Sequence, residues 1–120
     1  PQAMTTCIHT FFEAWGASSP EIRAEKTSAV IGPNFYYSDP NTAEPIRGQE
    51  AYLDYIAQFS AMMPGASARV VSVSEHHGHL RATVEFAKDG RRMMLGQYFA
   101  DLTDGKLTRV IGFTGMGEPD

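Results

Sequence analysis

The chain has little of several features that would point to a particular class of protein. It has one cysteine in 120 residues, Cys7, so no intramolecular disulfide can form and nothing requires an oxidising compartment. It has 10 basic against 14 acidic side chains, whereas a nucleic-acid-binding protein needs a net basic face. It has no apolar run of transmembrane length and no signal segment. We therefore expect a cytoplasmic protein with neither a nucleic-acid nor a membrane partner.

Motifs for cofactor binding and nucleophilic catalysis are also missing. There is no Gly-rich phosphate loop and no serine or cysteine nucleophile motif, so we expect no cofactor. His76, His77 and His79 could together bind zinc or nickel, but they lie at a predicted hairpin turn and only Glu75 is a nearby carboxylate. We interpret them as solvated turn residues and predict no required metal site.

The composition is that of a folded domain. Hydrophobic residues make up 42% of the chain and charged residues 20%, which excludes a disordered protein. A length of 120 residues is enough for one core and too short for two. We therefore expect a single domain over residues 1–120.

Apolar residues recur at helical spacing in the first half of the chain. The stripes consist of Ile8, Phe11, Phe12 and Trp15, and then of Tyr52, Tyr55, Ile56 and Phe59. Thr5 or Thr6 is the predicted cap of the first helix, and Ser19 that of the second, where Pro20 takes the first helical position. The predicted helices span residues 5–15, 20–29 and 49–62.

The rest of the chain alternates between strands and tight turns. The predicted strands span residues 35–38, 68–75, 80–87, 92–102 and 106–115. The apolar hairpin of residues 98–113, with its turn at Asp104-Gly105, needs further strands beside it and a layer packed on its face. Helices followed by a run of strands predict an α+β fold with the helices on one face of an antiparallel sheet.

The strand of residues 92–102 has no plainly polar side. Met94 and Tyr98 share one parity, which we assign to the helices, while Leu95 and Phe99 share the other. A strand that is apolar on both sides is expected to be covered on both faces. We therefore predict a homodimer formed through the outer face of the sheet.

Three short motifs carry a family resemblance. Asp39-Pro40 follows the short strand, Ile46-Arg47-Gly48 precedes the third helix, and Asp104-Gly105-Lys106-Leu107 lies late in the chain. With the order of elements, they resemble the SnoaL-like branch of the nuclear transport factor two-like superfamily, over nearly the whole chain. The resemblance implies a cone-shaped, curved antiparallel sheet wrapped round the helices and enclosing a pocket. It implies polyketide cyclisation, ketosteroid isomerisation, dehydration or epoxide hydrolysis, or a non-catalytic binding or dimerisation module.

Two residues are candidates for catalysis. Asp39 shares its parity with Tyr37 and could act as a base in an apolar pocket, or it could simply cap the loop before Pro40. SnoaL-like cyclases usually carry an aspartate two residues after the strand glycine, here Gly96, and this chain carries Tyr98 there. That departure counts against the cyclase mechanism. Tyr98 could still donate a hydrogen bond to an oxyanion and to Asp39, or it could be a pocket-wall aromatic.

A pocket for a small hydrophobic molecule would be lined mainly by apolar side chains of the helices and the inner sheet face. The predicted ligand-binding residues are Phe12, Trp15, Tyr37, Tyr52, Phe59, Val84 and Met94. Two hypotheses follow for the function. One is a cofactor-independent isomerase, cyclase or hydrolase that acts by proton transfer, and the other is a ligand-binding or dimerisation module without catalysis.

Overall fold

The computed structural model describes residues 2–119 of the chain, with side chains from residue 5 onward. Helix α1 (Gln2–Glu13) continues into a 3-10 turn, η1 (Ala14–Gly16), and is followed by α2 (Pro20–Val30), β1 (Ile31–Ser38), β2 (Ile46–Arg47) and α3 (Gln49–Met62). The chain then forms β3 (Ala66–His76), β4 (His79–Lys88), β5 (Arg91–Thr103) and β6 (Lys106–Thr114). The two ends of the expected domain, residues 1 and 120, lie outside the described residues.

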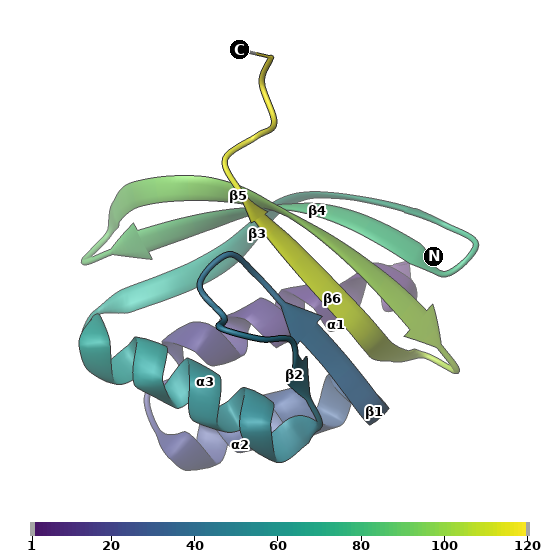
Figure 1. Cartoon of the computed structure of the whole chain (residues 1–120), viewed down its shortest axis with the longest axis horizontal. Helices are drawn as coiled ribbons and strands as arrows, with labels where there is room; N and C mark the ends of the chain where they lie inside the picture. The colour runs from purple at the N-terminus through teal and green to yellow at the C-terminus, as the bar shows by residue number, and fades with distance from the viewer. Residues whose placement is uncertain (1, 120) are drawn as a thin grey trace.

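The strands form one curved, open sheet, and the helices cover one of its faces (Figure 1). Within the described residues the strand order is β2-β1-β6-β5-β4-β3. Strand β1 pairs parallel with β6, and the other neighbouring pairs are antiparallel. The predicted α+β fold with a curved sheet wrapped round helices is confirmed. The parallel pair was not expected. Parallel strands need a long connection, and α3 and strands β3–β5 supply it between β1 and β6.

The helices follow their local signals closely. Ser19 Oγ accepts a hydrogen bond from Ile22 N at 3.1 Å, and Pro20 is the first helical residue of α2, as predicted. Helix α3 has the predicted bounds. The prediction that Thr5 or Thr6 caps the first helix is wrong, because α1 begins at Gln2 and both threonines lie inside it.

The core lies between the helices and the inner face of the sheet, as the stripes predicted. Its centre is aromatic: Phe11 stacks on Tyr52 with ring centroids 5.1 Å apart, and Phe35 and Tyr37 pack edge-on against Tyr52. These rings are fully buried. Burial of side chains of this size is the main stabilising contribution to such a fold.

No helix in the described part of the chain is long and apolar enough to cross a membrane.

Candidate functional site

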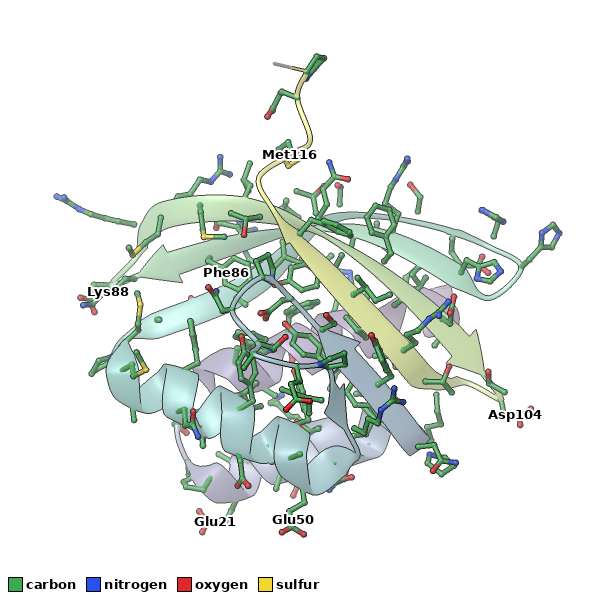
Figure 2. All side chains as sticks on the ribbon, viewed as in Figure 1. Glu21, Glu50, Phe86, Lys88, Asp104 and Met116 are labelled. Atoms are coloured by element: carbon green, nitrogen blue, oxygen red, sulfur yellow. The ribbon has the colours of Figure 1, made fainter. Side chains whose placement is uncertain are left out.

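A cavity of about 510 Å³ lies at one end of the layer between the helices and the sheet. Trp15 of η1, the loop after β1 and the C-terminal half of α3 form one side of it. The ends of β4 and β6 and the first half of β5 form the other side. Phe86 points from the sheet toward the helices here (Figure 2). The lining residues are Trp15, Asp39, Pro40, Asn41, Tyr55, Gln58, Phe59, Met62, Met63, Ala66, Phe86, Ala87, Met93, Met94, Tyr98, Phe113 and Thr114.

The two candidate catalytic residues both lie on this cavity. Asp39 follows the last residue of β1 and is 9% exposed. Tyr98, in the middle of β5, points to the inner face of the sheet, and its ring packs edge-on against Phe12 at a centroid distance of 4.7 Å. The alternation of side chains along each strand, read from the sequence, therefore predicted the correct face of the sheet for both residues.

Four groups donate hydrogen bonds to the Asp39 side chain. The hydroxyl of Tyr37 donates to Oδ2 at 2.6 Å, and that of Tyr55 donates to both oxygens, at 2.9 and 2.8 Å. The backbone N–H groups of Asn41 and Thr42 donate to Oδ1 at 2.7 and 3.1 Å. These partners all donate, as a carboxylate requires. The backbone bonds are those of a turn in which aspartate caps the loop, so Asp39 has that role in addition to its place on the cavity.

Tyr98 is not among these described donors. The expectation that it donates to Asp39 is therefore wrong, and Tyr37 and Tyr55 take that position instead. The reason is the shape of the loop: Asp39 turns toward its own strand neighbour and toward α3, which lies across β1.

Burial shifts the titration of the tyrosines around the cavity. It raises the pKa of Tyr37 well above 10.0, and the nearby Tyr98, Tyr52 and Asp39 add to that effect. Burial also raises the pKa of Tyr55, and the hydrogen bond to Asp39 raises it further because it holds the phenol proton. Burial raises the pKa of Tyr98 as well, while the Tyr37 hydroxyl acts in the opposite direction. All three side chains are therefore neutral phenols near pH 7.

Trp15 is held in place by a hydrogen bond inside the core. Its Nε1 donates to the Tyr52 hydroxyl at 2.9 Å, and the pair is buried. Around the indole lie Tyr55, Phe59 and Phe86, whose ring centroids are 6.1, 5.0 and 5.7 Å away. Because this bond occupies the only polar atom of the indole, Trp15 contributes only apolar atoms to the cavity wall.

The structure separates the predicted lining residues into two groups. Trp15, Phe59 and Met94 line the cavity, as Asp39 and Tyr98 do. Phe12, Tyr52 and Val84 are fully buried core residues that are not in the lining, and Tyr37 is buried behind Asp39. These four were misplaced because a stripe identifies the packed side of a helix or strand without showing which end of the layer stays open.

Sequence reasoning missed other residues of the site. Tyr55 is the most important, since it both lines the cavity and donates to Asp39. Its position in the same stripe as Tyr52 and Phe59 was a signal that it faces the sheet. Which turn of α3 reaches Asp39 depends on how that helix crosses β1, and the sequence does not show this. Met62 or Met63 extends the same stripe of α3, so one of them carried that signal, whereas Met93 carried none.

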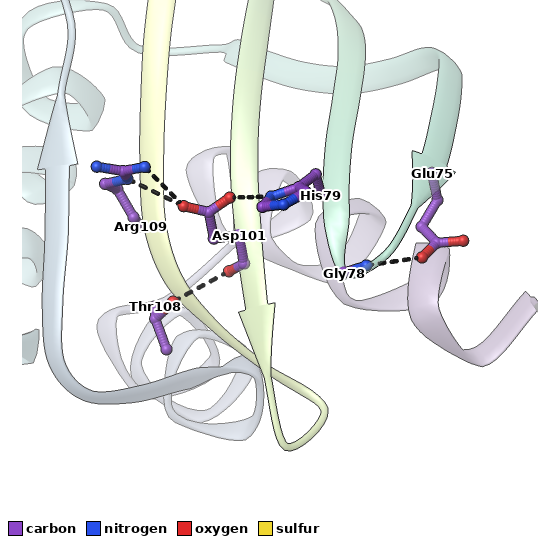
Figure 3. A network of polar contacts seen from close by, with 6 residues as sticks. All are labelled: Glu75, Gly78, His79, Asp101, Thr108 and Arg109. Carbon is purple, nitrogen blue, oxygen red and sulfur yellow. Dashed lines mark hydrogen bonds and ion pairs between the residues drawn. The ribbon is translucent and has the colours of Figure 1, made fainter.

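His79, the first residue of β4, lies on the outer face of the sheet beside Asp101 of β5 and Arg109 of β6 (Figure 3). His79 Nδ1 is 2.7 Å from Asp101 Oδ1, and Arg109 pairs with the other oxygen of Asp101 at 2.9 Å. Burial opposes ionisation of Asp101, but His79 and Arg109 outweigh it and hold the pKa of that carboxyl below its ordinary value. Among the described residues, no group of three or more His, Cys, Asp or Glu side chains is arranged to hold a metal ion. The prediction that no metal is required stays a prediction.

Comparison with known proteins supplies the family. The sequence profile of the SnoaL-like domain matches residues 8–110. No relative is found among the curated proteins.

Solved structures share the fold at low sequence identity. A candidate isomerase of the SnoaL-like family from Agrobacterium tumefaciens is 21% identical, with a TM-score of 0.85 over 97% of this chain and 100% of its own. A candidate SnoaL-like polyketide cyclase from a Jannaschia species is 17% identical, with a TM-score of 0.77 over 94% of this chain and 85% of its own. A candidate ketosteroid isomerase from Kribbella flavida is 20% identical, with a TM-score of 0.72 over 99% of this chain and 82% of its own. At such identities these similarities show the fold alone.

Proposed function

The chain belongs to the SnoaL-like family, and from that premise we propose that it binds a small, mainly apolar molecule in the cavity between the helices and the sheet. The observation that carries this proposal is the cavity of about 510 Å³, whose walls are mostly aromatic rings and methionines. Small-molecule sites are typically of this size, apolar and supplied with a few polar groups. Here the polar residues of the lining include Asp39, Tyr55 and Tyr98.

The methionines support a ligand of adaptable shape. Met62, Met63, Met93 and Met94 come from α3 with its C-cap and from β5, so they face the cavity from both layers. Met62, Met93 and Met94 are 80%, 56% and 37% exposed, so three exposed apolar side chains gather at this one site. Methionine is flexible and polarisable, and it adapts to irregular apolar surfaces.

A second candidate function is proton transfer next to a carbonyl group of the bound molecule. The observation that favours it is that Asp39 and Tyr98 line the same cavity, where the first could act as base and the second could donate to the developing oxyanion. The four donors on Asp39 weigh against it, because a base that accepts a proton must give up some of them. Binding is therefore the primary proposal, and catalysis is secondary.

Binding is tested with a neutral, apolar fluorescent probe and two matched variants. Phe59→Ala removes a ring from the cavity wall, and Phe99→Ala removes one from the outer face of the sheet. We expect the probe to bind the parent protein, to bind Phe59→Ala at least about tenfold more weakly, and to bind Phe99→Ala as it binds the parent. Equal weakening by both variants, or no binding to the parent, would contradict the proposal.

Catalysis is tested by exchange of α-protons of apolar ketones in deuterated water, followed by NMR. Asp39→Asn should slow any catalysed exchange by a factor of about 100 or more, since general base catalysis contributes that much. Asp104→Asn, a change at an exposed turn residue, is the control and should leave exchange unchanged. A parent protein that binds the probe but exchanges no ketone would leave the non-catalytic binding module as the function.

A further inference from the structure

The charge on the cavity wall is of one sign. Among the described residues that line the cavity, Asp39 is the only charged one, and no lysine, arginine or histidine is in the lining. The chain as a whole has a formal charge of −4. A carboxylate set in an apolar wall projects a negative potential into the space before it, because apolar side chains screen a charge less than bulk water does.

The aromatic rings on the cavity wall also favour a positively charged ligand. The indole of Trp15 is surrounded by Tyr55, Phe59 and Phe86, and Tyr98 lies 6.1 Å from Phe86 between ring centroids. The face of an aromatic ring carries the negative part of its quadrupole and attracts cations, tryptophan most strongly. Several rings and one carboxylate around a single space therefore favour a positively charged group.

The hydrogen bonds of Asp39 narrow the kind of cation. Oδ1 already accepts from Asn41, Thr42 and Tyr55, and Oδ2 accepts from Tyr37 and Tyr55. A primary ammonium group needs acceptors for its three N–H bonds once it leaves water, and this carboxylate has few lone pairs left to offer. A quaternary ammonium group has no N–H bonds and needs only negative potential and ring faces.

We infer that the natural ligand of the cavity carries a quaternary ammonium group on an apolar body. The inference rests on the proposed function, since it names the class of molecule that the same cavity binds. Asp39 acts as a fixed charge in this interaction, and the partly exposed ring of Phe59 contacts the alkylated nitrogen.

Two basic residues near the cavity raise the alternative that its ligand is an anion. Lys88 ends β4 and Arg91 begins β5, close in sequence to lining residues, and Lys88 is at the end of the sheet away from Asp104 (Figure 2). The neighbouring Arg92 is paired with Glu85 at 2.7 Å. If the two free cations selected the ligand, an apolar anion would bind best, so the experiment includes one.

The test compares ligands of one size and different charge. Benzyltrimethylammonium has a neutral carbon isostere, neopentylbenzene, and the series is completed by benzylammonium and phenylacetate. Trp15, the one tryptophan of the chain, lies on the cavity wall, so its fluorescence reports binding directly, and calorimetry gives the affinities. We expect benzyltrimethylammonium to bind about tenfold more tightly than neopentylbenzene and more tightly than benzylammonium.

The outcomes separate this inference from the proposed function. Equal affinity of the cation and its isostere, or tighter binding of phenylacetate or benzylammonium, would overturn the inference and leave the binding function standing. Failure of the whole series and of the neutral fluorescent probe would overturn both.

Variants identify the groups responsible. Asp39→Asn should remove most of the preference for the cation while changing the affinity for neopentylbenzene less than about threefold, and Asp104→Asn should change neither. Phe59→Leu keeps an apolar side chain but loses the ring, so it should weaken the cation more than the isostere, with Phe99→Leu as control. If Asp39→Asn does not fold, Phe59→Leu still decides, because equal weakening of both ligands would contradict a cation–ring contact.

Discussion

The ring of Tyr98 occupies the space that a side chain at Gly112 would need. The two residues are partners across β5 and β6, and a Cβ added at Gly112 would lie 2.7 Å from Cζ and 2.8 Å from Cδ2 of Tyr98. No such contact is tolerated between real carbon atoms, so the absence of a side chain at 112 is what allows Tyr98 to lie flat against the sheet. Gly112 therefore positions one wall of the cavity.

The first prediction concerns this pair. Gly112→Ala should displace the Tyr98 ring, lower the free energy of unfolding by about 1–3 kcal/mol as overpacked cores do, and weaken the neutral fluorescent probe. Gly32→Ala is the control, since a Cβ there would be no closer than 3.4 Å to its neighbours. Urea unfolding and probe titration check both effects. In a Tyr98→Ala background, where the ring is already gone, Gly112→Ala should cost much less stability than in the parent, and an equal cost in both backgrounds would contradict the clash.

The second prediction concerns the two phenols that donate to Asp39. Tyr37→Phe removes a donor that is fully buried, and we expect the free energy of unfolding to fall by about 1.5–3 kcal/mol, the range for hydrogen bonds to charged groups. Tyr55→Phe should cost less, under about 1.5 kcal/mol, because water in the cavity can replace the lost donor. Chemical denaturation checks both, and a larger loss for Tyr55→Phe would contradict this view of the network.

The third prediction is a loss of stability in alkali. Burial raises the pKa of Tyr37 and Tyr52 well above 10.0, and it also raises that of Tyr55 and Tyr98. Above about pH 10 the unfolded chain loses phenol protons that the folded chain keeps, so the free energy of unfolding falls as the pH rises. Below pH 10 this contribution is fully present. Each such tyrosine contributes up to about 1.4 kcal/mol per pH unit.

Urea unfolding between pH 8 and 11, with tyrosinate absorbance, measures the effect. Tyr37→Phe should reduce the slope of the free energy of unfolding against pH by the contribution of one tyrosine. Ionisation of every tyrosine near pH 10 without unfolding would contradict the prediction.

Periodicity predicted the fold and one part of the site. The alternation of a strand is strict, so the shared parity of Tyr37 and Asp39 correctly placed both on one face, and Tyr98 on the inner face of β5. The helical stripes likewise predicted the packed faces of α1 and α3. Periodicity does not give the spacing between the helix layer and the sheet at each point along a helix or strand. That spacing decides whether a residue on the packed face lies in the core or lines the cavity.

Two features of the sheet that were not predicted depend on pairing between distant parts of the chain. Strand β2 has two residues, Ile46 and Arg47, and forms because the loop after Asp39 folds back along β1. The parallel pairing of β1 with β6 joins residues such as Tyr37 and Val110, far apart in the sequence. Neither has a local sequence signal, and both shape the loop that holds Asp39.

The outer face of the sheet carries an apolar patch, which we define as Leu95, Phe99, Ile111 and Phe113. Phe113, near the end of β6, also belongs to the lining of the cavity. Phe99 is 40% and Phe113 56% exposed, and their ring centroids are 6.0 Å apart. Two groups of paired charges lie on either side, Arg69–Glu85–Arg92 and His79–Asp101–Arg109. An exposed apolar centre with a polar rim is typical of a surface that binds another protein.

The last prediction follows from that patch: the chain is a homodimer that buries it. Phe99→Asp should convert the dimer to a monomer, because a carboxylate placed opposite its own copy would be buried without a partner. The same charge on an exposed apolar residue elsewhere should have no such effect, and Ile22→Glu on α2 provides this control at 41% exposure. Sedimentation velocity at micromolar concentration gives the mass. A parent protein that sediments as a monomer would contradict the prediction, and so would a Phe99→Asp variant that stays folded and dimeric, since the interface would then lie on another surface.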